Sequence, residues 1–330
     1  MKALITGITG QDGSYLAEFL LEKGYQVHGI VRRDSLKNEE RLENIVHIKD
    51  RLTLHEASLN DHLSIYNIFL KVLPSECYHL SASSFVSDTF NNEFDTMNFN
   101  FNSTHYILSA IKEVCDKCRF FFAGSSEMFG DPSISPQSES TQFNPKSIYG
   151  ISKVASHYLL KNYRDREGIF ACTGLMYNHE SPRRGSHFVT KKIISTATRI
   201  KHGLETELIL GNLDSVRDWG YSPDYVQAMW QILQIENPDD FIIATGKLHS
   251  VRQFLDIVFT YLGLDYRDYV RVDSKFYRKG EKVPLCGDTG KINRVIGWQS
   301  KKNLQSIIYE MVDKEEIKFL KDRIGTSKLN

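Results

Sequence analysis

Residues 7 to 13 read GITGQDG, directly after a short apolar run, KALIT, at residues 2–6. Gly7, Gly10 and Gly13 have the spacing GxxGxxG, and an amphipathic stretch follows them. Glycine lets backbone N–H groups approach an anion closely, and the first turn of a helix offers unpaired N–H groups. The placement of this turn between a strand and a helix therefore predicts a dinucleotide-binding site.

The first half of the chain repeats this alternation of strand and helix. Further strand-like runs read YQVHGIV, LTLHEA, ECYHL, RFFFAG and IFACTGLMY, and helical stretches separate them. This order predicts an α/β fold with a doubly wound, parallel Rossmann sheet and a smaller, interleaved C-terminal substrate domain. We expect the dinucleotide-binding domain to cover 1–177, about 213–240 and 283–312, and the nucleotide-sugar-binding domain to cover 178–212, 241–282 and 313–330.

Composition excludes several classes of function. The formal net charge of the 330 residues is zero, so no basic excess predicts a nucleic-acid or membrane partner. No apolar run reaches the roughly 18 residues of a membrane-spanning helix, and the chain begins with a strand pattern rather than a signal peptide. The five cysteines show no disulfide framework, and the lone CxxC at Cys115 and Cys118 lacks a second pair for zinc. We expect a cytoplasmic protein without a metal site.

Two further stretches follow the second predicted strand. Arg32 and Arg33 stand where NAD-binding sites usually place an acid for the ribose 2′-hydroxyl, and Asp34 lies past that position. Two guanidiniums suit a 2′-phosphate, so the sequence predicts NADP. The charged stretch from Lys37 to Arg51 is predicted to form a solvent-exposed helix.

The catalytic pattern lies in the stretches AGSSEMFG (123–130) and SIYGISK (147–153). Tyr149 and Lys153 are four residues apart and share one face of the predicted helix. A lysine beside a phenol lowers the pKa of the phenol, which predicts a general base for the oxidation of an alcohol. Ser125 ends the strand RFFFAG, where it can reach the same site.

These motifs together resemble those of a known family. GxxGxxG, a strand that ends in serine and YxxxK are typical of the extended short-chain dehydrogenases/reductases. YNHESPRRGSHFVTKKI, GNLDSVRDWGYSPDYVQAMW and GDTGKINRVIGW also resemble the GDP-mannose 4,6-dehydratases, nearly end to end. The resemblance implies an NADP-dependent hydro-lyase. It would convert GDP-mannose to GDP-4-keto-6-deoxymannose by internal redox with tightly bound NADP, as a homodimer or homotetramer.

The resemblance also explains the acid at Glu127. A 4,6-dehydratase must remove a proton from C5 of the sugar and expel the C6 hydroxyl, and this requires an acid/base group besides Tyr149. The family has threonine, serine and glutamate where this chain has Ser125, Ser126 and Glu127. The implied catalytic residues are Ser125, Glu127, Tyr149 and Lys153.

Binding residues carry over one position at a time. The resemblance implies cofactor contacts at Gly7, Ile8, Thr9, Gly10, Gln11, Asp12, Arg32, Arg33, Ser58, Leu59, Leu80, Ser81, Ala82, Ser84, Tyr149, Lys153, His179 and Arg184. It implies substrate contacts at Ser84, Phe85, Ser126, Glu127, Asn178, Val189, Lys192, Arg217, Arg278 and Glu281.

Four departures from the family pattern keep alternatives open. Ser58 replaces an acid, Ser83 a glutamine, Phe85 a histidine and Asp95 a tyrosine. Changes near the sugar leave a GDP-manno-heptose 4,6-dehydratase as an alternative. A nucleotide-sugar 4-epimerase is another, although it does not need a glutamate at position 127. A non-catalytic NADP-binding paralogue is a third, although the intact Ser125, Glu127, Tyr149 and Lys153 argue against it.

Overall fold

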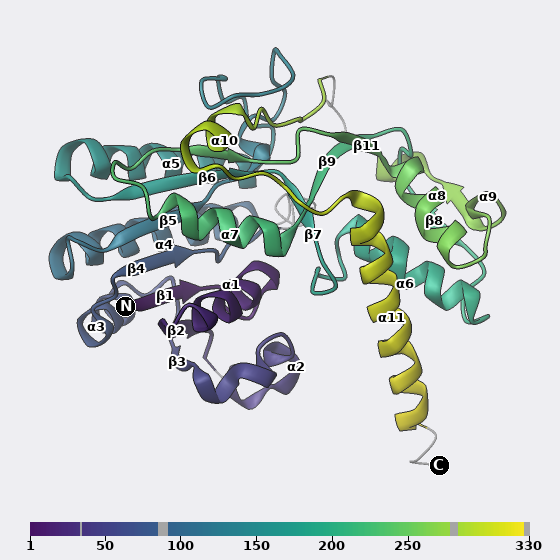
Figure 1. Cartoon of the computed structure of the whole chain (residues 1–330), viewed down its shortest axis with the longest axis horizontal. Coiled ribbons are helices and arrows are strands. Elements are labelled where there is room, and N and C mark those ends of the chain that lie inside the picture. The colour runs from purple at the N-terminus through teal and green to yellow at the C-terminus, as the bar shows by residue number, and fades with distance from the viewer. Residues whose placement is uncertain (34, 85–91, 278–282, 327–330) are drawn as a thin grey trace.

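Seven parallel strands form the central sheet of the computed structural model, which describes residues 1–33, 35–84, 92–277 and 283–326. Their order is β10-β6-β5-β4-β1-β2-β3 (Figure 1). The strands are β1 (Lys2–Thr6), β2 (Gln26–Val31), β3 (Thr53–Glu56), β4 (Glu76–His79), β5 (Arg119–Ala123), β6 (Ala171–Met176) and β10 (Phe241–Ile243). The chain leaves β1 for β2 and β3 and then returns to the other side of β1 at β4. Ligands of such sheets bind where the strand order reverses, and the predicted fold class is confirmed.

Helices cover both faces of the sheet. The helices α1 (Gln11–Glu22) and α7 (Ser222–Ile232) pack on one face, and α3 (His62–Val72), α4 (Glu93–Val114) and α5 (Ile148–Glu167) pack on the other. The phenylalanines of β5 show the alternation, because Phe121 joins the first core while Phe120 and Phe122 join the second. A strand buried on both faces explains the continuous apolar run in the sequence.

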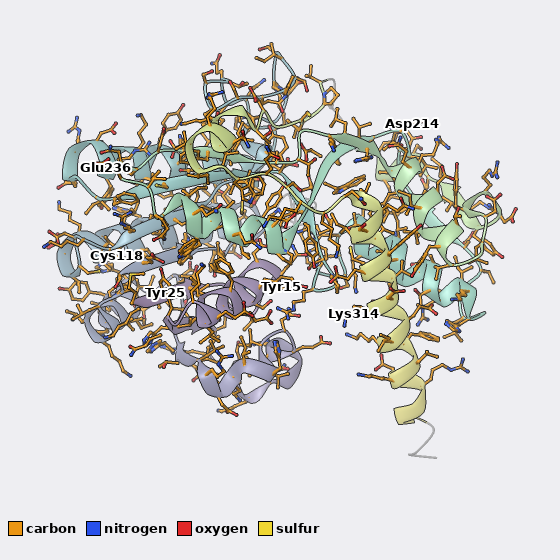
Figure 2. The ribbon with its side chains drawn as sticks, viewed as in Figure 1. Tyr15, Tyr25, Cys118, Asp214, Glu236 and Lys314 are labelled. Atoms are coloured by element: carbon orange, nitrogen blue, oxygen red, sulfur yellow. The ribbon has the colours of Figure 1, made fainter. Side chains whose placement is uncertain are left out.

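A smaller unit adjoins the carboxyl end of the sheet. It contains one sheet of β7 (Asn178–Glu180), β9 (Val216–Tyr221) and β11 (Leu248–Ser250), and a second of β8 (Leu208–Leu210) and β12 (Val270–Val272). Its helices are α6 (Val189–Lys201), α8 (Val251–Tyr261), α9 (Tyr266–Tyr269) and α11 (Leu304–Thr326). Residues of α6, α8 and α11, among them Ile194, Phe254 and Ile308, share one core. Asp214 and Lys314 lie in this part, whereas Tyr25 and Cys118 lie with the large sheet (Figure 2).

The domain division remains a proposal, and three elements bear on its boundaries. β10 pairs with β6 in the large sheet, and α11 packs against α6 and α8. The short helix α10 (Gly290–Ile296) lies against β10. We propose that the dinucleotide-binding domain includes β10 and α10, and that the nucleotide-sugar-binding domain includes α11 from Leu304 onward.

The single helix predicted for the charged stretch from Lys37 to Arg51 is wrong. The chain forms α2 (Glu39–Leu42) and 3-10 turns at Ser35–Lys37 and Val46–Arg51. Leu42, Ile45 and Ile48 are buried in the core on the α1 side. These three apolar side chains are spaced three residues apart, and their burial stabilises tight turns rather than one long helix. The many charged residues between them make this spacing difficult to recognise in the sequence.

Candidate active site

A cavity of about 590 Å³ lies at the carboxyl end of the sheet. Its lining residues come from the ends of β4, β5 and β6, from α5, and from β7, α6, β8 and β9 of the smaller unit. All four residues predicted to be catalytic, Ser125, Glu127, Tyr149 and Lys153, line it. The fold therefore brings these side chains together from separate elements.

The glycine turn joins β1 to α1 beside this cavity. Gly7 has φ of +73°, and a Cβ on Gly13 would lie 2.2 Å from the carbonyl oxygen of Gly7. Gly10 caps α1 without a side-chain hydrogen bond. The backbone N–H groups at this helix N-terminus are not capped by a side chain, and no Cβ atom blocks access to them. Such a turn fits the diphosphate of a dinucleotide. The predicted residues Gly7, Ile8, Thr9, Gly10, Gln11 and Asp12 form this turn and the start of α1.

Asp12 connects the glycine turn to the smaller unit. The Nε2 of His179 donates a hydrogen bond to Asp12 Oδ2 at 2.8 Å, and the hydroxyl of Ser222 donates to Oδ1 at 2.7 Å. The Nδ1 of His179 donates to the carbonyl oxygen of Tyr177 at 2.7 Å. Burial alone would raise the pKa of Asp12 and lower that of His179, but the attraction between them reverses both shifts. His179 thus neutralises an acid that would otherwise repel a diphosphate.

Two arginines stand at the end of the site expected to hold the adenosine ribose. Arg32 and Arg33 follow β2, and both side chains are exposed. Ser58 and Leu59 follow the neighbouring strand β3, Ser58 exposed and Leu59 buried. Asp34 lies outside the described residues. The predicted ribose-end residues thus lie on neighbouring strand ends.

The segment after β4 runs along the glycine turn. The backbone N–H groups of Leu80 and Ser81 both donate to Thr6 Oγ1 at 3.2 Å. A Cβ on Gly7 would make a tight contact, 3.0 Å from the backbone nitrogen of Ser81, and the φ of +73° also favours glycine at this position. The predicted cofactor residues of this segment are Leu80, Ser81, Ala82 and Ser84.

Ser125 and Tyr149 form the centre of the cavity wall. Ser125 ends the turn after β5, and its Oγ accepts a hydrogen bond from the backbone N–H of Glu127 at 3.2 Å. Tyr149 lies in the first turn of α5, which Ser147 caps through a bond from the N–H of Gly150 at 3.0 Å. Burial raises the pKa of Tyr149 to about 12, although a hydrogen bond with Ser125 acts in the opposite direction.

Lys153 is buried one turn further along α5. Its ammonium donates to the carbonyl oxygen of Ala123 at 2.7 Å and lies 5.8 Å from the centre of the Tyr149 ring. Burial lowers the pKa of Lys153 to about 7. The sequence predicted that Lys153 would lower the pKa of the phenol, whereas the pKa of Tyr149 is raised, because burial is the largest influence on it.

Most of the predicted substrate residues line the same cavity. Lys192 donates to the carbonyl oxygen of Ile209 at 2.9 Å, and Arg217 donates to that of Val216 at 2.7 Å. Their cationic side chains line the same cavity. The predicted residues Ser84, Ser126, Glu127, Asn178, Val189, Lys192 and Arg217 all line it, whereas Phe85, Arg278 and Glu281 lie outside the described residues.

Sequence reasoning missed several residues of the cavity wall. Glu180, His187 and Thr190 lie within the stretch YNHESPRRGSHFVTKKI, so the motif was the available signal. Their roles depend on contacts between β7 and α6, which no local pattern reveals. Asn212, Ser215 and Trp219 lie within GNLDSVRDWGYSPDYVQAMW, so that motif was the available signal for them. Phe276, in the smaller unit, carried no signal.

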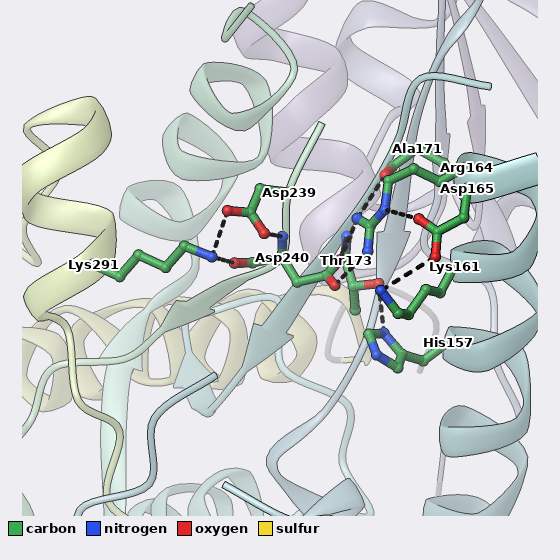
Figure 3. A network of polar contacts seen from close by, with 9 residues as sticks. All are labelled: His157, Lys161, Arg164, Asp165, Ala171, Thr173, Asp239, Asp240 and Lys291. Atoms are coloured by element: carbon green, nitrogen blue, oxygen red, sulfur yellow. Dashed lines mark hydrogen bonds and ion pairs between the residues drawn. The ribbon is translucent and has the colours of Figure 1, made fainter. Parts of the chain in front are cut away.

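A polar network joins α5 to β6 and to the residue before β10 (Figure 3). Arg164 donates two hydrogen bonds to Asp240, at 3.0 and 2.9 Å, and a third to the carbonyl oxygen of Ala171. Asp240 also accepts from the backbone N–H of Thr173, whose hydroxyl bonds to His157. These contacts join α5, β6 and the start of β10, so they fix the helix that carries Tyr149.

The described part of the chain contains neither a candidate metal site nor a candidate membrane-spanning helix. Among those residues no group of three or more histidines, cysteines or acids is arranged to hold a metal ion. No helix within the described ranges is long and apolar enough to cross a membrane.

Comparison with known proteins agrees with this geometry. The family model for GDP-mannose 4,6 dehydratase matches residues 4–311. GDP-mannose 4,6 dehydratase 2 of Arabidopsis thaliana is 46% identical over 323 residues, which are 95% of this chain and 86% of that protein. The Cricetulus griseus GDP-mannose 4,6 dehydratase is 41% identical, covering 94% of this chain and 90% of its own.

The solved structures agree on the fold. DesIV of Streptomyces venezuelae, a dTDP-glucose 4,6-dehydratase solved with NAD bound, superposes with a TM-score of 0.84 at 21% identity, over 95% of this chain and 96% of its own. At this low sequence identity the similarity supports only the fold, that of the extended short-chain dehydrogenases/reductases. Because the family model and the relatives span nearly the whole chain, the protein belongs to the GDP-mannose 4,6-dehydratase family.

Proposed function

We propose that this protein dehydrates GDP-mannose to GDP-4-keto-6-deoxymannose. The observation that carries the proposal is the meeting of Glu127 with Ser125 and Tyr149 in one cavity. A dehydrogenase or an epimerase needs the serine and the tyrosine, whereas elimination of water needs a further acid/base group. Membership of the family supports the same reaction.

Oxidation at C4 opens the reaction. A nicotinamide held by the proposed cofactor residues would supply the chemistry of this step, which is acceptance of a hydride from C4 and its later return to C6. Tyr149 takes the proton from the C4 hydroxyl, and Ser125 orients that hydroxyl through the hydrogen bond that the two side chains share. Because burial raises the pKa of Tyr149, its deprotonation needs positive charge nearby, and Lys153 and the oxidised nicotinamide are the proposed sources.

Elimination follows from the new ketone. The C4 ketone acidifies the proton on C5, and Glu127 removes it. Glu127 then gives a proton to the C6 hydroxyl, which leaves as water. The hydride equivalent taken from C4 returns to C6. Glu127, which takes up a proton from solvent after water has left, then protonates C5, and Tyr149 releases the proton of the C4 hydroxyl to solvent. The cofactor is regenerated within the turnover.

NADP is the proposed cofactor. Arg32 and Arg33 are exposed at the end of β2, where guanidiniums can hold a 2′-phosphate. Ser58 and Leu59 would border the adenine, and Leu80, Ser81, Ala82 and Ser84 would border the nicotinamide. His179 and Arg184 would contact the cofactor from the smaller unit.

The GDP part of the substrate would bind on the opposite side of the cavity. Lys192 and Arg217 supply positive charge for its diphosphate, and Asn178 and Val189 lie in the same wall. Arg278 and Glu281 remain predicted contacts. Family resemblance further leads us to propose a homodimer or homotetramer in the cytoplasm.

Mass spectrometry of the nucleotide sugar tests the function. Incubation with GDP-mannose should give a product that is lighter by one water. An epimerase would leave the mass unchanged, and a non-catalytic paralogue would leave the substrate unchanged. In calorimetric titrations GDP should bind more tightly than UDP or dTDP, and the reverse order would contradict the proposed substrate.

A further inference from the structure

The cavity wall contains a buried acid that the reaction above does not use. Glu180 is the last residue of β7 and is 1% exposed. The hydroxyl of Thr190 donates to its Oε2 at 2.6 Å, and Arg184 Nε lies 3.2 Å from the same oxygen. A charged carboxylate at such a depth is unfavourable unless it is paired, so these contacts are what hold the charge there.

Arg184 is fixed by this acid and by an aromatic ring. Its guanidinium carbon lies 3.6 Å from the centre of the Phe188 ring, and the side chain is only 13% exposed. Arg184 and Tyr149 both line the cavity. Glu180 therefore determines where a nearly buried positive charge stands relative to the base of the C4 oxidation.

We propose that Glu180 is a positioning residue for C4 oxidation: it holds Arg184 in the cavity wall shared with Tyr149, and its charge offsets part of the positive charge that acts on the phenol. The inference rests on the proposed function, because it assumes that Tyr149 takes the C4 hydroxyl proton. The inference adds an ion pair between Glu180 and Arg184, outside the catalytic motifs, that influences the pKa of this base.

The charges around Tyr149 determine in which direction each substitution should shift the pKa of this side chain. Burial raises the pKa of Tyr149 most, the charges of Glu127 and Asp12 raise it further, and the charge of Arg184 lowers it. Lys153, one turn further along the same helix, is a second cationic side chain near the ring of Tyr149. A change that strengthens the field of Arg184 should therefore make Tyr149 deprotonate at lower pH, and a change that removes Arg184 should do the reverse.

The surroundings of Glu180 allow its charge to be removed with little change of shape. Burial raises the pKa of Glu180, while Arg184, the Thr190 hydroxyl and His179 oppose that rise, and Asp12 adds to it. Glutamine at this position keeps a carbonyl oxygen that can accept from Thr190 or Arg184. Glu180→Gln therefore removes the charge opposite Arg184 and leaves an acceptor oxygen at the same place.

The test is the pH dependence of the first hydride transfer. Enzyme saturated with NADP is mixed with GDP-mannose, and the absorbance of the reduced nicotinamide gives the rate. The acid limb of this profile reports deprotonation of the base. Relative to wild type, Arg184→Gln should move the limb to higher pH by on the order of one pH unit. Glu180→Gln should move it to lower pH, and Arg184→Lys, which keeps the charge, should reverse most of the change that Arg184→Gln causes.

Glu76→Gln is the matched control. Glu76 is also buried and accepts hydrogen bonds from Tyr25 and Tyr78, but it lies in β4 and does not line the cavity. Its variant should lower stability without moving the limb. The inference would be overturned if the acid limb moved in the same direction in Glu180→Gln and Arg184→Gln, or moved in neither variant. In both cases the wild-type enzyme would still dehydrate GDP-mannose. Failure of the wild-type enzyme to release water from GDP-mannose would instead overturn the proposed function.

Discussion

Gly150 lies so close to Glu127 that a Cβ on the glycine would stand 2.5 Å from the carbonyl oxygen of Glu127. The glycine follows Tyr149 directly in α5. Its missing side chain therefore lets the helix that carries the proposed C4 base approach the turn that carries the proposed C5 base. The close approach of these two elements therefore requires a residue without a side chain at position 150.

Replacement of Gly150 by alanine should lower the rate of dehydration far more than it lowers the stability of the folded protein. Alanine favours a helix by about 1 kcal/mol over glycine, but its Cβ must push α5 away from a backbone oxygen. A displacement of about 1 Å in an active site can cost about 10²-fold in rate, so we expect a loss of this order in steady-state dehydration.

The control for Gly150→Ala is Asn162→Ala, on the exposed face of the same helix. It also introduces alanine, and activity should stay near that of wild type. If Gly150→Ala were as active as this control, the close approach of α5 to Glu127 would have no catalytic importance.

The two arginines after β2 should decide the choice of cofactor. A hydrogen bond to a charged group contributes about 1.5–3 kcal/mol, so loss of Arg32 and Arg33 together should weaken NADP binding by at least about 10²-fold. NAD, which lacks the 2′-phosphate, should be affected far less. Equilibrium titration of each cofactor measures the difference.

Lys49→Ala with Arg51→Ala is the matched variant for this experiment. Both side chains are exposed in the neighbouring turn, and the double change removes the same net charge. It should leave the preference for NADP unchanged. An equal loss of NAD and NADP binding in the Arg32 and Arg33 variant would place these arginines away from the 2′-phosphate.

Stability should depend on pH through the pair of Asp12 and His179. The pKa of His179 is raised above 6.5, so its contribution is complete below that value and is lost as pH rises through the raised pKa. The pKa of Asp12 is lowered below 3.8, so its contribution is lost as pH falls through the lowered value. The pair therefore stabilises the folded protein most between these limits, and a tenfold change in either acid dissociation constant corresponds to about 1.4 kcal/mol.

Urea unfolding of wild type and His179→Gln across pH measures this contribution. The difference in free energy of unfolding should be largest in weakly acidic solution and should shrink as pH rises above the ordinary range of histidine. Asp12→Asn should flatten the same dependence, since it removes the partner charge. A difference that stays constant with pH would mean that the pair is not charged in the folded protein.

Local patterns in the sequence predicted the parts of the site that are themselves local. The glycine turn is a matter of spacing within one strand-to-helix junction, and Tyr149 and Lys153 share one helix face. The contact of Gly150 with Glu127 joins segments whose approach depends on the whole sheet, so no local pattern could reveal it. The raised pKa of Tyr149 was missed for a similar reason, since burial depends on elements distant in the sequence.

Glu127 gives the most direct test of the proposed chemistry. Glu127→Gln keeps the shape and the hydrogen bonding of the side chain but cannot take a proton from C5. General acid–base groups contribute about 10²–10⁴-fold, so dehydration should fall by that order. Oxidation at C4 depends on Tyr149 and should survive, so enzyme-bound NADPH should accumulate when GDP-mannose is added, as its absorbance would report.

Isotopes and a neighbouring acid complete this test. In deuterium oxide the wild-type enzyme should place solvent deuterium at C5 of the product, while the hydride from C4 reaches C6 without exchange. Asp131→Asn changes the next acid along the chain, which does not line the cavity, and should leave dehydration unaffected. Because proton removal at C5 precedes loss of the C6 hydroxyl, an unlabelled C5 would exclude the elimination proposed here. Near-normal dehydration by Glu127→Gln would assign the C5 proton to another base and leave Glu127 with a structural role in the turn after β5.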